Sequence, residues 1–137
     1  MKKSPQDLEL LKKLSERKTS TVAFDLDGTL AKFSSWKGYS SIGNPVPKIA
    51  KLARKCKKAG AYIVIFTCRI TTADNKVYLK SVNTVSQWLK SNRIPYDEIW
   101  LGIGKPHADY YVDDRAIRVS CTHCINTLTS ELILANE

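Results

Sequence analysis

The chain has 137 residues, of which 43% are hydrophobic and 26% are charged, as in an ordinary soluble domain. This length predicts one domain, residues 1–137, with a single core. No apolar run reaches the ~20 residues of a membrane span, and the polar start contains no secretory signal. We therefore expect a cytoplasmic protein with no membrane partner and with reduced thiols at its four cysteines, Cys56, Cys68, Cys121 and Cys124.

The formal net charge is +9, from 22 Lys and Arg against 13 Asp and Glu. Such an excess attracts polyanions such as nucleic acid, nucleotides or acidic surfaces. A second explanation is that the lysines only keep a small protein in solution. Charge alone leaves both open, because it sets the affinity for anions and not their identity.

The first half of the chain predicts two helices around one buried strand. The Ser-Pro pair at residues 4 and 5 and the leucines after it are typical of a helix start. In chain order we expect a helix over 4–17, a strand over 21–25, an irregular loop over 31–46 and a helix over 47–60. The apolar face of that second helix is expected to comprise Ile49, Leu52, Ala53 and Cys56.

The second half alternates apolar runs with amphipathic stretches. The run over 61–67 has the length and composition of a central parallel strand. It is followed by an expected helix over 78–89 (inward residues Tyr78, Val82, Val85 and Leu89), strands over 99–101, 110–112 and 118–120, and a terminal helix from Thr122 with Ile125, Leu128 and Leu132 on one side. This alternation predicts an α/β fold, a three-layer Rossmann-like parallel sheet with helices on both faces.

Two carboxylates follow the first strand. The segment Phe24-Asp25-Leu26-Asp27-Gly28-Thr29-Leu30 places acids two residues apart, directly before a glycine turn. Residues i and i+2 of an extended chain share a face, so both acids are expected at the end of a buried strand. Paired carboxylates there suit a hard divalent cation, or a division of nucleophile and acid roles.

Three later segments bring further polar groups to the same edge. They are Thr67-Cys68-Arg69 after the second strand, Gly104-Lys105-Pro106-His107, and Asp113-Asp114 after the strand over 110–112. In open parallel sheets, ligands bind outside the carboxyl ends of the strands. The sequence therefore predicts a site of acids, a hydroxyl and an ammonium at this edge.

With these four segments the chain resembles the haloacid dehalogenase (HAD) superfamily. Residues 25–29 are similar to the first motif of that family, Thr67 to the second, Lys105 to the third and Asp113-Asp114 to the fourth. The resemblance covers residues 20–119. It implies a phosphatase, because members with an aspartate at the position of Asp27 are typically phosphatases, whereas the ATPases of the superfamily carry Thr there.

The resemblance also implies a role for each residue. Asp25 is expected to be the nucleophile that forms an aspartyl-phosphate, and Asp27 the general acid and base. Thr67 and Lys105 are expected to neutralise the phosphoryl oxygens. The implied Mg²⁺ ligands are Asp25, Asp27 through its carbonyl oxygen, and a fourth-motif acid, with Asp114 preferred as the direct ligand and Asp113 behind it.

Three residues beside the expected phosphate are predicted to bind substrate, Gly28, Cys68 and Arg69. For Arg69 the alternative is an ordinary surface arginine in a strand–helix loop. Only ~16 residues separate the first motif from the next helix, which leaves no room for a cap domain. The site is therefore expected to be open, or covered by a partner subunit.

Two other features leave alternatives open. The loop over 31–46 carries Trp36 and Tyr39, which could stack a base or fold back over the sheet edge. Cys121-Thr122-His123-Cys124 lacks the second ligand pair of a zinc site, and no role is assigned to it or to His107.

The expected function is thus Mg²⁺-dependent hydrolysis of a phosphomonoester, from a phosphorylated small molecule, a nucleotide or a nucleic-acid end. Two alternatives stay open: phosphoryl transfer to an acceptor other than water, and a non-catalytic basic module that binds a polyanion.

Overall fold

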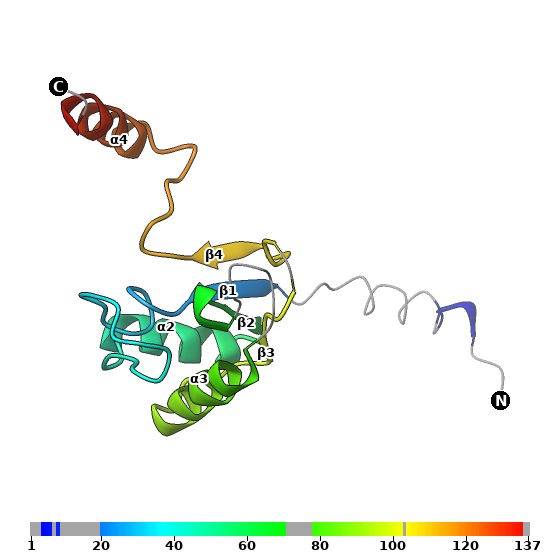
Figure 1. Cartoon of the computed structure of the whole chain (residues 1–137). Coiled ribbons are helices and arrows are strands. Elements are labelled where there is room, and N and C mark those ends of the chain that lie inside the picture. Colours follow the sequence, from blue (N-terminus) through cyan, green and yellow to red (C-terminus); the bar gives the residue numbers. More distant parts are fainter. Residues whose placement is uncertain (1–3, 7, 9–19, 71–77, 103, 136–137) are drawn as a thin grey trace.

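The computed structural model describes residues 4–6, 8, 20–70, 78–102 and 104–135. They form an α/β Rossmann-like fold, a parallel sheet flanked by helices, which confirms the predicted class (Figure 1). The elements are β1 (Thr21–Asp25), α2 (Pro47–Lys58), β2 (Tyr62–Phe66), the 3₁₀ turn η1 (Cys68–Ile70), α3 (Leu79–Ser91), β3 (Glu98–Ile99), β4 (Tyr110–Val112) and α4 (Thr122–Ala135).

Most predicted elements lie within two residues of their observed bounds. The predicted strand over 118–120 is wrong: the Cys121 N–H donates to the Arg118 carbonyl at 2.9 Å, which closes a turn. The predicted helix over 4–17 lies almost wholly outside the described residues.

The four strands are parallel and stand in the order β3-β2-β1-β4. β1 therefore lies inside the sheet, where its backbone pairs with β2 on one side and β4 on the other. Parallel strands end at one edge, so the residues after β1, β2 and β4 all meet there. That edge is where the sequence placed its candidate site.

One face of the sheet packs against both α2 and α3. Alternate strand residues, Val22 and Phe24 of β1 and Ile63 and Ile65 of β2, form one buried cluster with Ala50 and Ala53 of α2 and Val85 and Leu89 of α3. Right-handed crossovers explain this placement, since β1, β2 and β3 follow one another in the same direction across the sheet. Two residues predicted inward are more than a third exposed, Leu52 at 38% and Tyr78 at 41%.

The opposite face is crossed by the connection from β3 to β4. This connection must pass β2 and β1, and the right-handed rule puts it on the face away from α2 and α3. Its described residues, 100–102 and 104–109, contain no helix. Ala23 and Val64, which point to this face, are nevertheless buried, and so is Pro106. A short irregular segment thus covers the face where a helix commonly packs in such folds.

α4 stands apart from the sheet at the end of an extended segment after β4 (Figure 1). The side predicted to be apolar is exposed there, with Ile125 at 41%, Leu128 at 39% and Leu132 at 56%. Among the described residues, no helix has both the length and the apolar character needed to cross a membrane.

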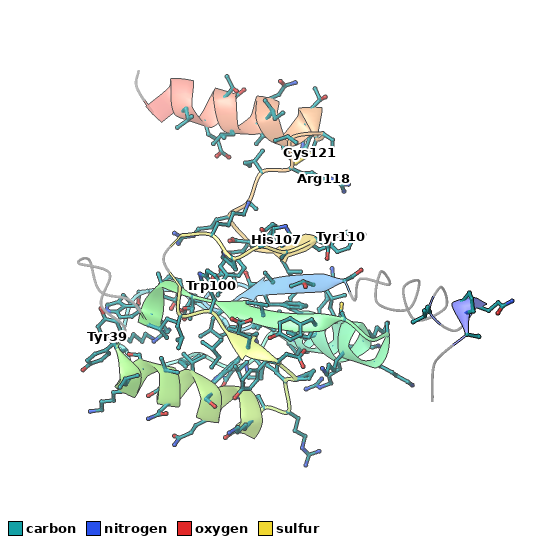
Figure 2. All side chains as sticks on the ribbon, turned by 90° about the vertical axis from the view of Figure 1, so that its right-hand side faces the viewer. Tyr39, Trp100, His107, Tyr110, Arg118 and Cys121 are labelled. Carbon is teal, nitrogen blue, oxygen red and sulfur yellow. A yellow bond between two sulfur atoms is a disulfide. The ribbon has the colours of Figure 1, made fainter. Side chains whose placement is uncertain are left out.

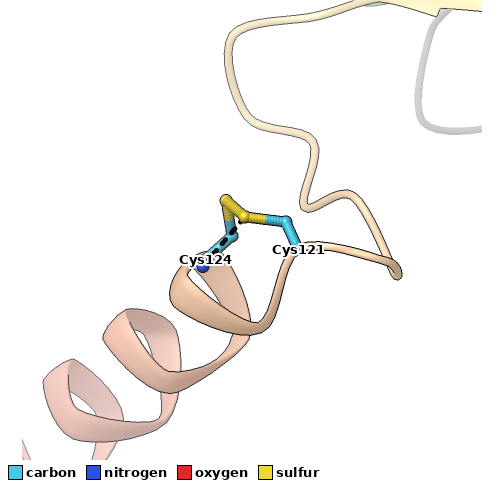
Figure 3. Close-up of a disulfide and its surroundings, with 2 residues drawn as sticks. All are labelled: Cys121 and Cys124. Atoms are coloured by element: carbon cyan, nitrogen blue, oxygen red, sulfur yellow. Dashed lines mark hydrogen bonds between the residues drawn. A yellow bond between two sulfur atoms is a disulfide. The ribbon is translucent and has the colours of Figure 1, made fainter.

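The expectation of four reduced thiols is half wrong. Cys121 and Cys124 form a disulfide, whereas Cys56 and Cys68 are free (Figure 3). The first turn of α4 explains the pairing, because it holds the two Cα atoms 5.3 Å apart, within the usual span of a disulfide. The Cys124 N–H also donates to Cys121 Sγ at 3.2 Å.

Candidate active site

A row of side chains crosses the sheet at the ends of the strands. Asp25 pairs with Phe66 on β2, and Phe24 pairs with Val112, so Asp113 is the next neighbour of Asp25 on the β4 side. The row continues beyond β2 to Trp100, whose N–H donates to the Ile65 carbonyl at 2.8 Å. Laterally paired residues of parallel strands share a face, so this row lies on the face away from α2 and α3.

Three carboxylates meet at one end of this row. One oxygen from each of Asp25, Asp113 and Asp114 lies within 4.8 Å of the other two. Gly28, in the left-handed conformation with a φ of 88°, makes this approach possible, since a Cβ at that position would lie 2.5 Å from Asp114 Oδ2. The predicted glycine turn therefore opens space for the fourth-motif acid.

Thr29 links the two acidic segments. Its buried hydroxyl lies 3.2 Å from both Asp25 Oδ2 and Asp114 Oδ1, and it accepts a hydrogen bond of 3.0 Å from the Asp114 N–H. One hydroxyl proton serves one carboxylate at a time. The sequence motif includes Thr29, but its role depends on contact with a residue 85 positions later.

Crowding of these acids changes the titration of the predicted nucleophile. Burial first, and then the nearby charges of Asp113 and, less strongly, Asp114, raise the pKa of Asp25 to about 6, against hydrogen bonds from the Leu26 backbone and Thr29 that lower it. A cation among the three oxygens would offset this repulsion. The donor set consists of carboxylate oxygens alone, which fits a hard divalent ion such as Mg²⁺.

Thr67 and Lys105 lie beside the acids, along a cavity of about 450 Å³ that Asp113 also lines. Thr67 follows β2 directly and accepts the Arg69 N–H through Oγ1 at 3.2 Å. The Lys105 ammonium lies 4.1 Å from the centroid of the Tyr111 ring. The strand ends and the β3–β4 connection therefore gather the predicted hydroxyl, the ammonium and an acid around one cavity.

Asp27 is held by Arg69. The guanidinium donates through Nε to Asp27 Oδ2 at 2.6 Å and through Nη2 to Oδ1 at 2.7 Å. Its other donors reach the carbonyls of Gly38 and Tyr39, at 3.0 and 3.1 Å, and of Ser41, at 2.7 Å. All five N–H groups of an arginine are thereby used.

Neither sequence interpretation of Arg69 describes this arrangement. Arg69 is only 1% exposed, so it is not a surface arginine. In this conformation it also has no N–H left to bind a substrate phosphate. It instead ties the loop over 31–46 to the end of β1, a role that depends on backbone carbonyls some 30 positions earlier.

The aromatic residues of that loop contact one another around Arg69. The rings of Trp36 and Tyr39 meet edge to face at 5.0 Å, and the Arg69 guanidinium lies 4.8 Å from the Trp36 ring. Both rings remain partly exposed, Trp36 at 49% and Tyr39 at 41%. They are therefore folded back in part, and base stacking on this loop stays a prediction.

Cys68 is exposed and lines the same cavity as Thr67, which is compatible with its predicted place beside the phosphate. Two residues that the sequence did not single out, Trp100 and Tyr111, also line it. A tryptophan just after a short strand and an aromatic pair within the next strand are the signals that could have identified them.

No protein-family model matches the chain, and no curated protein sequence matches it. Solved structures do match its fold. A conserved protein from Bacteroides thetaiotaomicron is 16% identical with a TM-score of 0.54, over 88% of this chain and 93% of that one. A structural genomics target from Vibrio cholerae is 26% identical with a TM-score of 0.50, over 82% of this chain and 98% of that one.

A chain of the Pnkp1/Rnl/Hen1 RNA repair complex is 17% identical over 85% of this chain and 32% of that one, with a TM-score of 0.45, too low to support any statement. The two better matches are consistent with the α/β Rossmann-like fold at low sequence identity. These matches support the fold, and the chemistry has to be inferred from the residues of the site.

Proposed function

We propose that this protein is a Mg²⁺-dependent phosphomonoester hydrolase of the HAD type. The observation that supports it best is the convergence of Asp25, Asp113 and Asp114 at one sheet edge, beside the cavity that Thr67 and Lys105 line. Together these residues come from all four motifs that resemble the HAD superfamily, with Asp113 and Asp114 both in the fourth. Three carboxylate oxygens this close to one another are the kind of donor set that a hard divalent cation binds.

In this proposal Asp25 attacks phosphorus and forms an aspartyl-phosphate as the alcohol leaves. Thr67 and Lys105 contact the phosphoryl oxygens and offset their charge. The Gly28 N–H donates to the Ala31 carbonyl at 2.8 Å and the Thr29 N–H to the Leu26 carbonyl at 3.1 Å, so both are engaged within the turn after Asp25. Water then hydrolyses the acyl-phosphate and releases inorganic phosphate and Asp25.

Asp25 and Asp114, with Asp113 beside them, would hold Mg²⁺, which when bound neutralises phosphoryl charge and the repulsion among the acids. Asp27 is the proposed acid and base. Since Arg69 occupies both of its carboxylate oxygens, proton transfer requires a second lone pair of Asp27 or a partial release of the guanidinium.

The decisive experiment compares wild type with Asp25→Asn in hydrolysis of an aryl phosphate with Mg²⁺. We expect turnover by wild type and a loss of at least about 1,000-fold in the variant, because the amide is no nucleophile. Glu131→Gln, at an exposed acid on α4, removes the same charge far from the site and is the matched control.

Two outcomes would contradict the proposal. Equal rates in wild type and Asp25→Asn would exclude Asp25 as the nucleophile. Inactivity of both proteins toward aryl, sugar and nucleotide phosphates, together with tight salt-sensitive binding of a polyanion, would instead favour the basic binding module.

A further inference from the structure

The cavity beside the acids has aromatic walls. It is lined by Phe66 of β2, Tyr111 of β4 and Trp100 after β3, and by Gly102, Gly104 and Pro106 of the β3–β4 connection. Its volume of about 450 Å³ is within the range of small-molecule sites. The proposed chemistry uses the polar residues of this cavity, Thr67, Lys105 and Asp113, but assigns no role to its aromatic residues.

The topology explains why the described residues leave this space unfilled. A parallel crossover usually carries a helix that packs on the sheet, whereas the described part of this one has none. Figure 2 shows the connection as it runs from Trp100 to His107 beside β4. The side chains of Phe66 and Tyr111 consequently face a hollow under an irregular segment.

The walls are held in place by specific contacts. Trp100 Nε1 donates to the Gly104 carbonyl at 3.0 Å, and the ring lies so close to Gly102 that a side chain there would collide with it. Tyr111 donates its hydroxyl to the Pro106 carbonyl at 2.6 Å and meets the Phe66 ring edge to face at 6.3 Å. These rings are therefore positioned before any ligand binds.

The row across the sheet sets the spacing from the proposed nucleophile. Neighbouring strands lie about 4.8 Å apart, so the backbone of Phe66 is about 5 Å and that of Trp100 about 10 Å from that of Asp25. A ring held there is separated from a phosphate at Asp25 by a short spacer. A pentose between phosphate and base has this size, whereas a directly attached aryl group would stay close to Asp25.

We propose that this cavity binds the base of a free nucleoside monophosphate while its phosphate lies at Asp25. The proposal rests on the phosphatase function and names its substrate class. Stacking on Trp100 and the Phe66 and Tyr111 rings supplies base-tolerant affinity. The Lys105 ammonium lies over the Tyr111 ring at the same cavity, and the volume suits one nucleoside and not a run of bases.

The test compares a nucleoside 5′-monophosphate with ribose 5-phosphate, which lacks only the base. We expect wild type to prefer the nucleotide in kcat/KM, and Trp100→Ala to lower that preference, the ratio of the two kcat/KM values, roughly 10- to 100-fold. Trp100→Phe retains a ring and should keep most of the preference. This variant tests the proposal even if Trp100→Ala fails to fold. Trp36→Ala is the control at the other partly exposed tryptophan near the site.

Calorimetry with the unphosphorylated nucleoside tests the cavity without any turnover, and Trp100→Ala should abolish that binding. If the nucleotide, ribose 5-phosphate and aryl phosphate are all left unhydrolysed, the phosphatase function fails. If they are hydrolysed but the base makes no difference, the cavity proposal alone fails. Three further results would also overturn the cavity proposal. The first is loss of the preference in Trp36→Ala and not in Trp100→Ala, and the second is a higher kcat/KM for a 5′-phosphorylated oligonucleotide than for the nucleotide. The third is a particle mass in solution that changes with Trp100→Ala.

Discussion

At the scale of single residues, Arg69 connects two parts of the site that are far apart in sequence. It pairs with Asp27 at the end of β1 and donates to three carbonyls of the loop over 31–46. Arg69 is 1% exposed and the Asp27 side chain 14%, so little water can replace the donor that Asp27 would lose. An unpaired buried carboxylate and orphaned carbonyls are each costly.

We therefore expect Arg69→Met to lower the free energy of unfolding by about 3–5 kcal/mol. Arg54→Met is the matched control, because Arg54 also donates to two backbone carbonyls, of Asn92 and Arg93, but at an exposed position. It should cost less than about 1 kcal/mol. Urea denaturation of both variants measures the difference, and equal losses would show that Arg69 is no more important than a surface arginine.

At the scale of elements, burial separates α3 from α4. Leu89 of α3 is fully buried in the core cluster, whereas Leu128 of α4 is 39% exposed on a helix that stands off the sheet (Figure 1). Leu89→Ala should lower the free energy of unfolding by about 2–5 kcal/mol. Leu128→Ala should change it by under about 0.5 kcal/mol. Thermal or urea unfolding of both variants measures these changes. A large loss of unfolding free energy in Leu128→Ala would mean that α4 packs on a core in solution.

Sequence patterns predicted the elements that a local run of apolar residues defines. The apolar runs before Asp25 and Thr67 identified β1 and β2, and the motif spacing identified the edge where they end. Contacts between distant segments were not predictable in this way. The burial of Arg69 depends on where the loop carbonyls lie, and the exposed face of α4 has the same apolar spacing as a packed one.

The cavity was missed for a related reason. Periodicity detects helices and strands, and the connection after Trp100 has neither. Its importance comes from the strand order, which obliges it to cross β2 and β1 on the face that α2 and α3 leave free. The disulfide was missed because localisation was inferred first, while the pairing itself follows from two cysteines three positions apart on one helical turn.

At the scale of the whole molecule, we expect the acid cluster to make stability depend on pH and, under the proposed function, on Mg²⁺. The pKa of Asp25 is raised from 3.8 to about 6 by burial and then by Asp113 and Asp114. Without metal, the folded protein therefore holds a proton on Asp25 that the unfolded chain releases near pH 4. The stabilising contribution of that proton is complete below about pH 4 and is lost as the pH rises through about 6.

Two results follow for metal-free protein and for protein with Mg²⁺. Above about pH 7 and without metal, Asp25→Asn should be more stable than wild type, since it lacks the buried charge, and this difference should shrink toward pH 4. Mg²⁺ should raise the free energy of unfolding of wild type at high pH, where it faces no competing proton, and should do so far less in the variant. Urea titrations from about pH 4 to 8 with chelator or Mg²⁺ measure both effects, with Glu131→Gln as the charge control. Equal stabilisation of Asp25→Asn and wild type by Mg²⁺ would place the cation elsewhere than among Asp25, Asp113 and Asp114.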